Sequence, residues 1–201
     1  RIAFRRHYNI ENDEIAIGII GRIVPVKNHS LFIDAIKYLH NKTNKKIRAF
    51  IIGDGDDRNK IEMKARQLGL NYTNFNISKE KALLTFTSWI KEIDYANAGM
   101  DIIALTSFNE GTPVSLIEAQ ASGTPVISTN VGGVKDILIP NKTGILCNSF
   151  DSQEFGEKLL NLVENDNLRQ NLSKEGWNFV KEKYHYSRLI NDMTNLYYKL
   201  L

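Results

Sequence analysis

Two glutamates flank the start of a predicted helix near the middle of the chain. Glu110 lies in the preceding loop and Glu118 lies on the helix, eight positions later. Eight helical residues span about 12 Å, whereas the paired carboxylates of a glycosidase lie roughly 5–9.5 Å apart. The spacing suits two sets of vicinal hydroxyls held on either side of a diphosphate, because carboxylates accept hydrogen bonds and a helix N-terminus attracts an anion.

Two cations form a second candidate group. Arg22 and Lys27 both follow the first predicted strand, and together they suit the neutralisation of a diphosphate. Each group also has an ordinary explanation. Most Arg and Lys side chains are exposed and uncommitted, Glu110 suits the dipole of the following helix, and Glu118 suits a solvated helix face.

The composition is that of an ordinary globular domain. The 201 residues are 42% hydrophobic and 24% charged, which is enough for one large domain with a buried core. A net charge of +3 is too small to indicate nucleic acid. Cys147 is the only cysteine, no apolar run approaches the roughly 18 residues of a membrane span, and no signal peptide is evident, so we expect a cytoplasmic protein. Because the chain opens on Arg1 rather than Met, we expect a fragment of a longer protein.

Short apolar runs alternate with segments of helical period. Strands are predicted at residues 15–21, 47–52, 83–86, 102–106, 125–128 and 144–147. Helices are predicted at residues 29–39 with Asn28 as the cap, at 58–68, 90–98 and 113–122, and from 151 onward. Asp151 and Glu154 resemble a capping box, and residues 71–81, which have no clear period, indicate a loop or an insertion.

Repeated strand–helix units predict an α/β fold, a doubly wound, Rossmann-like parallel sheet with a helical C-terminus, forming one domain over residues 1–201. Ligands of such sheets bind beyond the carboxyl ends of the strands. Arg22, Gly53, Trp89 and the segments 107–112 and 129–133 all follow predicted strands. We therefore expect them to lie along the same edge of the sheet.

Three motifs occur in an order typical of one family. In chain order the sequence contains GRIVPVKN, IIGDGDDR and LTSFNEGTPVSLIEAQASGTPVISTNVGG. Over about residues 15–201 it resembles the C-terminal domain of family-4, or group 1, glycosyltransferases of the GT-B fold. By this resemblance, Arg22 and Lys27 match the pair that contacts the donor diphosphate, Glu110 matches the glutamate facing the transferred sugar, and Glu118 matches the one holding the ribose.

The resemblance also assigns the surroundings of these side chains. Backbone N–H groups around Gly111 and Thr112 are expected to face the sugar or the phosphates. Here the sequence departs from members that carry an aromatic residue and Gly after the first Glu, and Pro113 has no N–H to donate. Gly132 and Gly133 are expected near the donor, with tight backbone packing as the alternative explanation.

The base of the nucleotide is expected between Gly53 and the segment 87–90, which includes Ile90. Trp89 is expected in the core, with stacking on the base as the alternative. Asp54 and Asp56 imitate a metal-binding Asp-x-Asp motif, but Asp is common in turns that open a helix. The sequence has no metal-ligand spacing and no Gly-x-Gly-x-x-Gly fingerprint, so no metal or other cofactor is expected. The basic residues between 42 and 48 suggest a solvated turn, with membrane contact as the alternative.

The resemblance implies a retaining transfer of a hexose-type sugar from a nucleotide diphosphate donor, with a UDP-sugar favoured. Arg22 and Lys27 would stabilise the leaving diphosphate, and Glu110 would orient the sugar. The acceptor, a carbohydrate or a lipid-linked sugar, would bind an N-terminal domain that this chain lacks. The setting implied is bacterial surface-polysaccharide assembly at the inner membrane face, with peripheral membrane contact possible there.

Two alternatives are open on the sequence alone. A nucleotide-sugar 2-epimerase uses the same two-domain architecture, and a non-catalytic nucleotide-sugar-binding module keeps the same fold. Neither fold nor composition separates them from a transferase. The stripe of apolar residues on the last helix is expected to pack on the missing domain and to leave apolar surface exposed.

Overall fold

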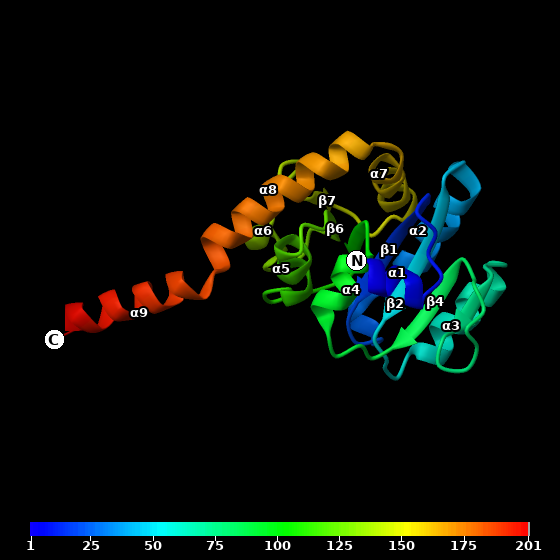
Figure 1. Cartoon of the computed structure of the whole chain (residues 1–201), viewed down its shortest axis with the longest axis horizontal. Helices are drawn as coiled ribbons and strands as arrows, with labels where there is room; N and C mark the ends of the chain where they lie inside the picture. Colours follow the sequence, from blue (N-terminus) through cyan, green and yellow to red (C-terminus); the bar gives the residue numbers. More distant parts are fainter. Residues whose placement is uncertain (201) are drawn as a thin grey trace.

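A parallel β-sheet forms the centre of the computed structural model, which describes residues 1–200 (Figure 1). Leu201, the last residue of the predicted domain, lies outside the described residues. In spatial order the strands run β3-β4-β2-β1-β5-β6-β7, and each neighbouring pair is parallel. They comprise β1 (Glu14–Ile20), β2 (Lys46–Ile52), β3 (Tyr72–Asn74), β4 (Leu84–Ser88), β5 (Ile102–Leu105), β6 (Val126–Thr129) and β7 (Ile145–Cys147). The doubly wound, Rossmann-like fold is confirmed.

Helices cover both faces of this sheet (Figure 1). One face packs against α2 (His29–Lys42), α3 (Arg58–Gln67) and α7 (Ser152–Glu164). The other packs against α1 (Ile2–His7), α4 (Ile93–Gly99), α5 (Val114–Ala121) and α6 (Val134–Ile137). Strand β1 shows why the sequence folds this way, since alternate residues serve opposite faces. Ile17 and Ile19 belong to the first core, and Ala16 and Ile20 belong to the second.

The order of the strands creates a switch point beside β1. From β1 the chain crosses to β2 on one side, and it later returns to β5 on the other side. The loops that follow the neighbouring strands β1 and β5 therefore leave in opposite directions, and a crevice opens at the carboxyl ends of these strands. The predicted site residues after these two strands lie at that crevice.

The N-terminal residues form an element that the sequence pattern did not predict. Helix α1 precedes β1 and buries Phe4 completely against the aromatic rings of Tyr8, Phe50 and Tyr95. Arg5 secures the following turn by donating to the carbonyl oxygens of Glu11 and Glu14, at 2.5 and 2.7 Å. A six-residue helix is too short to show a helical period, so its core contribution was invisible in the sequence.

Two predicted boundaries were wrong. Residues 71–81 contain the edge strand β3, which pairs with β4 from Tyr72↔Leu84 to Asn74↔Phe86. Three residues are too few for a visible alternation. Helix α4 begins at Ile93 rather than at residue 90, because the chain needs residues 89–92 to leave β4.

Two predicted caps differ in detail. Asn28 occupies the N-cap position of α2 but has a left-handed backbone (φ 47°), and its side chain makes no capping hydrogen bond. Asp151 does cap α7 by accepting from the N–H groups of Gln153 and Glu154. Glu154 does not complete the capping box. Lys158 Nζ donates to its carboxylate at 2.6 Å, and this neighbour, together with the Ser149 hydroxyl, lowers the pKa of Glu154 to about 2.

The described chain after β7 is helical, as predicted. Helix α7 is followed by α8 (Asp166–Tyr184), which packs on α5, and by α9 (Tyr186–Leu200), which extends away from the body (Figure 1). No residue of α9 is buried. Among the described residues, none of the helices combines the length and the apolar character needed to cross a membrane.

Replacing Phe4 with alanine tests the role of α1. We expect Phe4→Ala to lower the free energy of unfolding by about 3–5 kcal/mol, because the change leaves a cavity among three aromatic rings. Ile2→Ala is the matched control, since Ile2 lies on the same helix and is exposed. Urea unfolding of the 201-residue chain measures both. Equal stabilities of the two variants would show that α1 does not belong to the core.

Candidate functional site

The loops that follow β1 and β2 are joined by backbone hydrogen bonds. Gly21 N–H donates to the Ile52 carbonyl at 3.0 Å, and Ile23 N–H donates to the Asp54 carbonyl at 2.9 Å. Gly53 lies so close to this loop that a Cβ atom at its position would come within 2.0 Å of Gly21 O. These two turns therefore form one rigid wall of the crevice.

The loops that follow β1, β5 and β6 are joined in the same way. Phe108 N–H donates to the Val26 carbonyl at 2.8 Å, and Gly133 N–H donates to the Glu110 carbonyl at 3.0 Å. A Cβ atom at Gly132 would lie 1.9 Å from Glu110 O, which explains why glycine stands there. Gly132 and Gly133 thus fix the backbone of Glu110, whether or not they also contact a ligand.

An ion pair connects the two sides of the switch point. Lys27 Nζ lies 2.6 Å from Glu110 Oε1, although these residues follow different strands. The Glu110 side chain is only 9% exposed, and that of Lys27 is 26% exposed. Two of the four side chains singled out in the sequence are therefore in direct contact.

Ser107 holds the Glu110 carboxylate in place, and the sequence analysis did not single it out. Its hydroxyl donates to the same oxygen, Oε1, at 2.5 Å, and within residues 1–200 no group donates to Oε2. Ser107 is itself fully buried, and Thr129 Oγ1 donates to its carbonyl at 2.7 Å. The pattern leaves one carboxylate oxygen of Glu110 available for a further hydrogen bond.

The beginning of α5 presents free backbone amides beside this pair. Gly111 and Thr112 are exposed, and within the described part of the chain their N–H groups donate to no acceptor. Pro113 is the N-cap residue of α5 and makes no side-chain capping bond, so the first turn of the helix is uncapped. Unpaired amides at a helix N-terminus attract an anion.

Glu118 lies on α5, more than one helical turn after the free amides of Gly111 and Thr112, and it is half-buried. Burial raises the pKa of its carboxyl group, because no described side chain donates to it. Hydroxyl groups that donated to this carboxylate would favour its charged form and offset the desolvation. Among the described residues, its carboxylate is therefore an acceptor without a protein donor.

Other predicted residues lie at the same edge but do not join the ion pair. Arg22 is exposed and forms no ion pair within residues 1–200. Trp89 is 61% exposed at the end of β4, so the expectation of a core position was wrong. The chain turns outward there because Ser88 has a positive φ of 58°. Ile90 is half-buried against the second core.

A polar network that the sequence did not reveal supports the turn before Trp89. Arg58 Nη1 donates to Asp54 Oδ2 at 3.0 Å and to Ser88 Oγ at 2.9 Å, and the Ser88 hydroxyl also bonds Asp54. The interpretation of Asp54 as a turn residue is consistent with this geometry. Its carboxylate is occupied by neighbours, and these hydrogen bonds lower its pKa despite the desolvation that opposes them.

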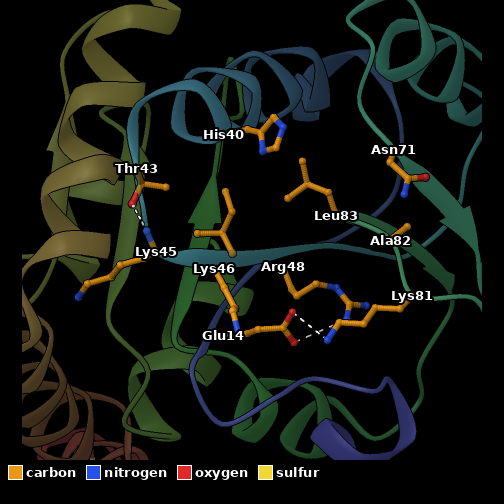
Figure 2. A pocket seen from close by; sticks show the side chains of 11 residues that line it. Glu14, His40, Thr43, Lys45, Lys46, Arg48, Asn71, Lys81, Ala82 and Leu83 are labelled. Atoms are coloured by element: carbon orange, nitrogen blue, oxygen red, sulfur yellow. Dashed lines mark hydrogen bonds and ion pairs between the residues drawn. The ribbon is translucent and has the colours of Figure 1, made fainter.

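A cavity of about 420 Å³ lies at the opposite, amino edge of the sheet (Figure 2). Several cations line it, but they have carboxylate partners. Lys81 Nζ lies 3.0 Å from Glu14 Oε1, and Lys46 Nζ lies 2.6 Å from Asp13 Oδ2. Arg48 is buried and donates to the carbonyl oxygens of Tyr8 and Asn9, so it anchors the N-terminal segment. This cavity contains none of the predicted site residues.

The fold and the crevice define a class of protein: a doubly wound α/β domain whose switch point carries an ion pair and an open helix N-terminus, an arrangement suited to an anionic ligand bearing hydroxyls. The family model for glycosyl transferases group 1 matches residues 1–179. The chain belongs to this family.

The chain is similar to named glycosyltransferases over most of its length, among them proteins of polysaccharide biosynthesis. The chain is 26% identical to the capsular polysaccharide biosynthesis glycosyltransferase CapM of Staphylococcus aureus, over 96% of this chain and 48% of that protein. It is 27% identical to the UDP-Gal:alpha-D-GlcNAc-diphosphoundecaprenol alpha-1,3-galactosyltransferase of Escherichia coli, over 94% of this chain and 46% of that protein. The chain therefore spans about half the length of these relatives.

Solved structures agree on the fold. The C-terminal domain of the group 1 glycosyl transferase LpcC from Francisella tularensis aligns with a TM-score of 0.72 and 29% identity, covering 85% of this chain and 86% of that domain. The Anabaena protein HepE in complex with UDP-glucose aligns with a TM-score of 0.83 and 18% identity, covering 98% of this chain and 52% of that one. The predicted match to the C-terminal half of a GT-B glycosyltransferase is confirmed.

Gly132→Ala tests the backbone packing behind Glu110. We expect a loss of more than about 2 kcal/mol in unfolding free energy, because the new methyl group would meet Glu110 O and the backbone φ is +48°. Gly111→Ala is the control in the same crevice. Nothing lies within 4 Å of its Cβ position, so a change within about 0.5 kcal/mol is expected. Chemical denaturation of both variants provides the comparison, and a Gly132→Ala protein as stable as Gly111→Ala would contradict the packing.

Proposed function

We propose that this chain is the donor-binding part of a retaining glycosyltransferase that takes a hexose-type sugar from a UDP-sugar. The observation that carries the proposal is the Lys27–Glu110 pair beside the uncapped start of α5. Lys27 and Arg22 supply positive charge for the diphosphate, and the α5 amides supply donors. Glu110 Oε2 then faces the sugar hydroxyls, and Glu118 faces the ribose. This assignment rests on the family resemblance as well as on the geometry.

The chemistry needs charge stabilisation more than a nucleophile from this chain. The bond between the anomeric carbon and the phosphate oxygen breaks, and the diphosphate leaves with the electron pair. The acceptor hydroxyl forms the new bond on the same face of the sugar and gives its proton to the leaving phosphate. Arg22, Lys27 and the α5 N-terminus stabilise the developing negative charge, which is the main catalytic contribution expected of a preorganised site. We propose that no metal ion or other cofactor takes part.

The names of related proteins support the choice of donor and setting. The E. coli relative is named for a UDP-Gal donor and a diphosphoundecaprenol-linked acceptor, and HepE was solved with UDP-glucose. We propose by analogy that the donor of this protein is a UDP-sugar and that its acceptor is a carbohydrate or a lipid-linked sugar. We propose a cytoplasmic location at the inner membrane face. The named relatives are transferases, which favours transfer over 2-epimerisation or binding alone.

Titration calorimetry with UDP, GDP and ADP tests the donor site directly. We expect the 201-residue chain to bind UDP best and to transfer no sugar alone. Glu118→Gln should weaken UDP binding about tenfold, or about 1.4 kcal/mol, by removing a charged acceptor for the ribose hydroxyls. The control is Glu182→Gln, because Glu182 is exposed on α8.

A second variant separates the phosphate contacts from the rest. Lys27→Met should weaken UDP binding and leave uridine binding unchanged, since uridine has no diphosphate to pair with the ammonium group. Equal affinity for all three nucleotides, or an unaffected Glu118→Gln protein, would reject the site.

We propose further that α9 packs on another domain of the same protein. Its apolar stripe is 40% to 75% exposed and consists of Leu189, Ile190, Met193, Leu196, Tyr197 and Leu200. The stripe continues into a cavity of about 500 Å³ between α5, α8 and α9, lined by Trp177, Tyr184 and Tyr186 among others. An apolar surface of this extent usually marks an interface. The relatives are about twice as long as this chain, which provides for such a domain.

Serine substitutions on α9 distinguish an interface from a structural role. The triple change Leu189→Ser, Met193→Ser and Leu196→Ser should leave the unfolding free energy of the 201-residue chain within about 0.5 kcal/mol, because none of these residues is buried. In the longer protein the same change should lower the melting temperature and uncouple the two domains in calorimetry. An unchanged melting profile of the longer protein would show that the stripe covers nothing within it.

A further inference from the structure

The charge of Glu110 is balanced by a single cation. Among the side chains that the structure describes, two donate to its carboxylate: the Lys27 ammonium at 2.6 Å and the Ser107 hydroxyl at 2.5 Å. The Glu110 side chain is only 9% exposed, so water compensates little of its charge. Within residues 1–200, Lys27 is the only ion-pair partner of Glu110, and Glu110 is the only ion-pair partner of Lys27.

The two cations of the proposed donor site therefore differ. Arg22 is exposed and forms no ion pair in the described chain, so a diphosphate that binds Arg22 displaces only water. A diphosphate that binds Lys27 instead competes with a carboxylate that is already in place. Binding through Lys27 thus changes the environment of Glu110 as well.

We propose that Glu110 makes the site select the sugar donor over the free nucleotide that remains after transfer. This inference rests on the proposed function, in which Lys27 contacts the diphosphate and Glu110 faces the sugar. When UDP binds without a sugar, Lys27 divides its charge between two anions, and the buried Glu110 carboxylate loses part of its only compensation. A UDP-sugar restores the balance, because its hydroxyls donate to Oε2, which has no donor among the described groups.

The geometry of the ion pair makes this competition close. A phosphate oxygen that accepts a hydrogen bond from Lys27 Nζ would lie within roughly 5.5 Å of Glu110 Oε1, because each bond to the ammonium is about 2.6 to 2.9 Å long. Two negative charges at that separation repel each other, and salt screens them weakly where they are partly buried. Glutamine at position 110 would remove this repulsion and would still accept the hydrogen bond from Ser107.

Ser107 limits how far Glu110 depends on Lys27. Its hydroxyl is the remaining described donor to the carboxylate when Lys27 turns toward a diphosphate. The residue is fully buried, and Thr129 Oγ1 donates to its carbonyl oxygen at 2.7 Å. Ser107 is thus a positioning residue, and loss of its hydroxyl should make UDP binding less favourable, which is the opposite of the change expected for Glu110→Gln.

Titration calorimetry of the 201-residue chain with UDP, UDP-glucose, UDP-galactose and UDP-N-acetylglucosamine tests the proposal. We expect Glu110→Gln to bind UDP at least about fivefold more tightly than the unsubstituted chain. The affinity of the best UDP-sugar relative to UDP should fall at least about tenfold in the same variant. Ser107→Ala should weaken UDP binding about threefold. Glu92→Gln is the matched control, because Glu92 is an exposed carboxylate in the loop between β4 and α4, at the same edge of the sheet, and a change within about twofold is expected.

The outcomes separate this inference from the donor site itself. UDP affinity that is unchanged or lower in Glu110→Gln would show that Lys27 serves both anions without competition, and would overturn the proposal. An equal gain in Glu92→Gln would reduce the effect to the general charge of the edge and overturn it too. If Glu110→Gln does not fold, a Ser107→Ala chain that binds UDP as tightly as the unsubstituted chain leads to the same conclusion.

Glu118→Gln provides the readout for the proposed function. If Glu118→Gln weakens UDP binding while Glu110→Gln leaves it unchanged, the donor site stands and the selection by Glu110 is rejected. If the unsubstituted chain binds no UDP, both are rejected.

Discussion

The ion pair between Lys27 and Glu110 is the constraint on which the site depends. Both charges are largely removed from water, and a buried pair of this kind contributes little net stability, because desolvation offsets most of the attraction. Its main effect is orientation. Lys27 and Ser107 both donate to Oε1, so this oxygen is held in place, and Oε2 has no described donor. The same pair ties the loop after β1 to the loop after β5, across the switch point.

Backbone geometry makes this orientation possible. Gly53 and Gly132 have positive φ values, and each lies where a side chain would collide with a neighbouring carbonyl oxygen. Thr106 Oγ1 donates to the carbonyl oxygens of Lys27 and Asn28, and this contact holds the end of the loop that follows β1. A site held in place before its ligand arrives loses less conformational entropy on binding. The backbone of the crevice is thus held in place around Lys27 and Glu110, while Trp89 and Arg22 at its rim are exposed.

The sequence predicted the sheet, most helices and the convergence of the site on one edge, because these follow from apolar periodicity and chain order. The prediction failed where an element is too short to show a period, and where the place of a residue depends on contacts between distant parts of the chain. Helix α1 and strand β3 have too few residues for a period, and their places depend on Phe50 and on β4. Trp89 was wrongly expected in the core because the positive φ of Ser88, which turns the chain outward, has no signature in a serine. The role of Ser107 depends on a contact with Glu110 that spacing alone does not reveal.

The two edges of the sheet differ in how their charges are balanced. At the amino edge, Lys45, Lys46 and Lys81 each pair with a carboxylate at 2.6 to 3.0 Å. Figure 2 shows one of these pairs, between Lys81 and Glu14. At the carboxyl edge, Arg22 and Lys60 have no such partner within residues 1–200. An uncapped α5 and the unpartnered ring of His29 lie there as well. Buried side-chain atoms without a partner do not mark this edge alone, since Arg48 Nε at the amino edge is one of them. What distinguishes the carboxyl edge is the open start of α5 beside the Lys27–Glu110 pair, and unpaired amides at a helix N-terminus attract an anion.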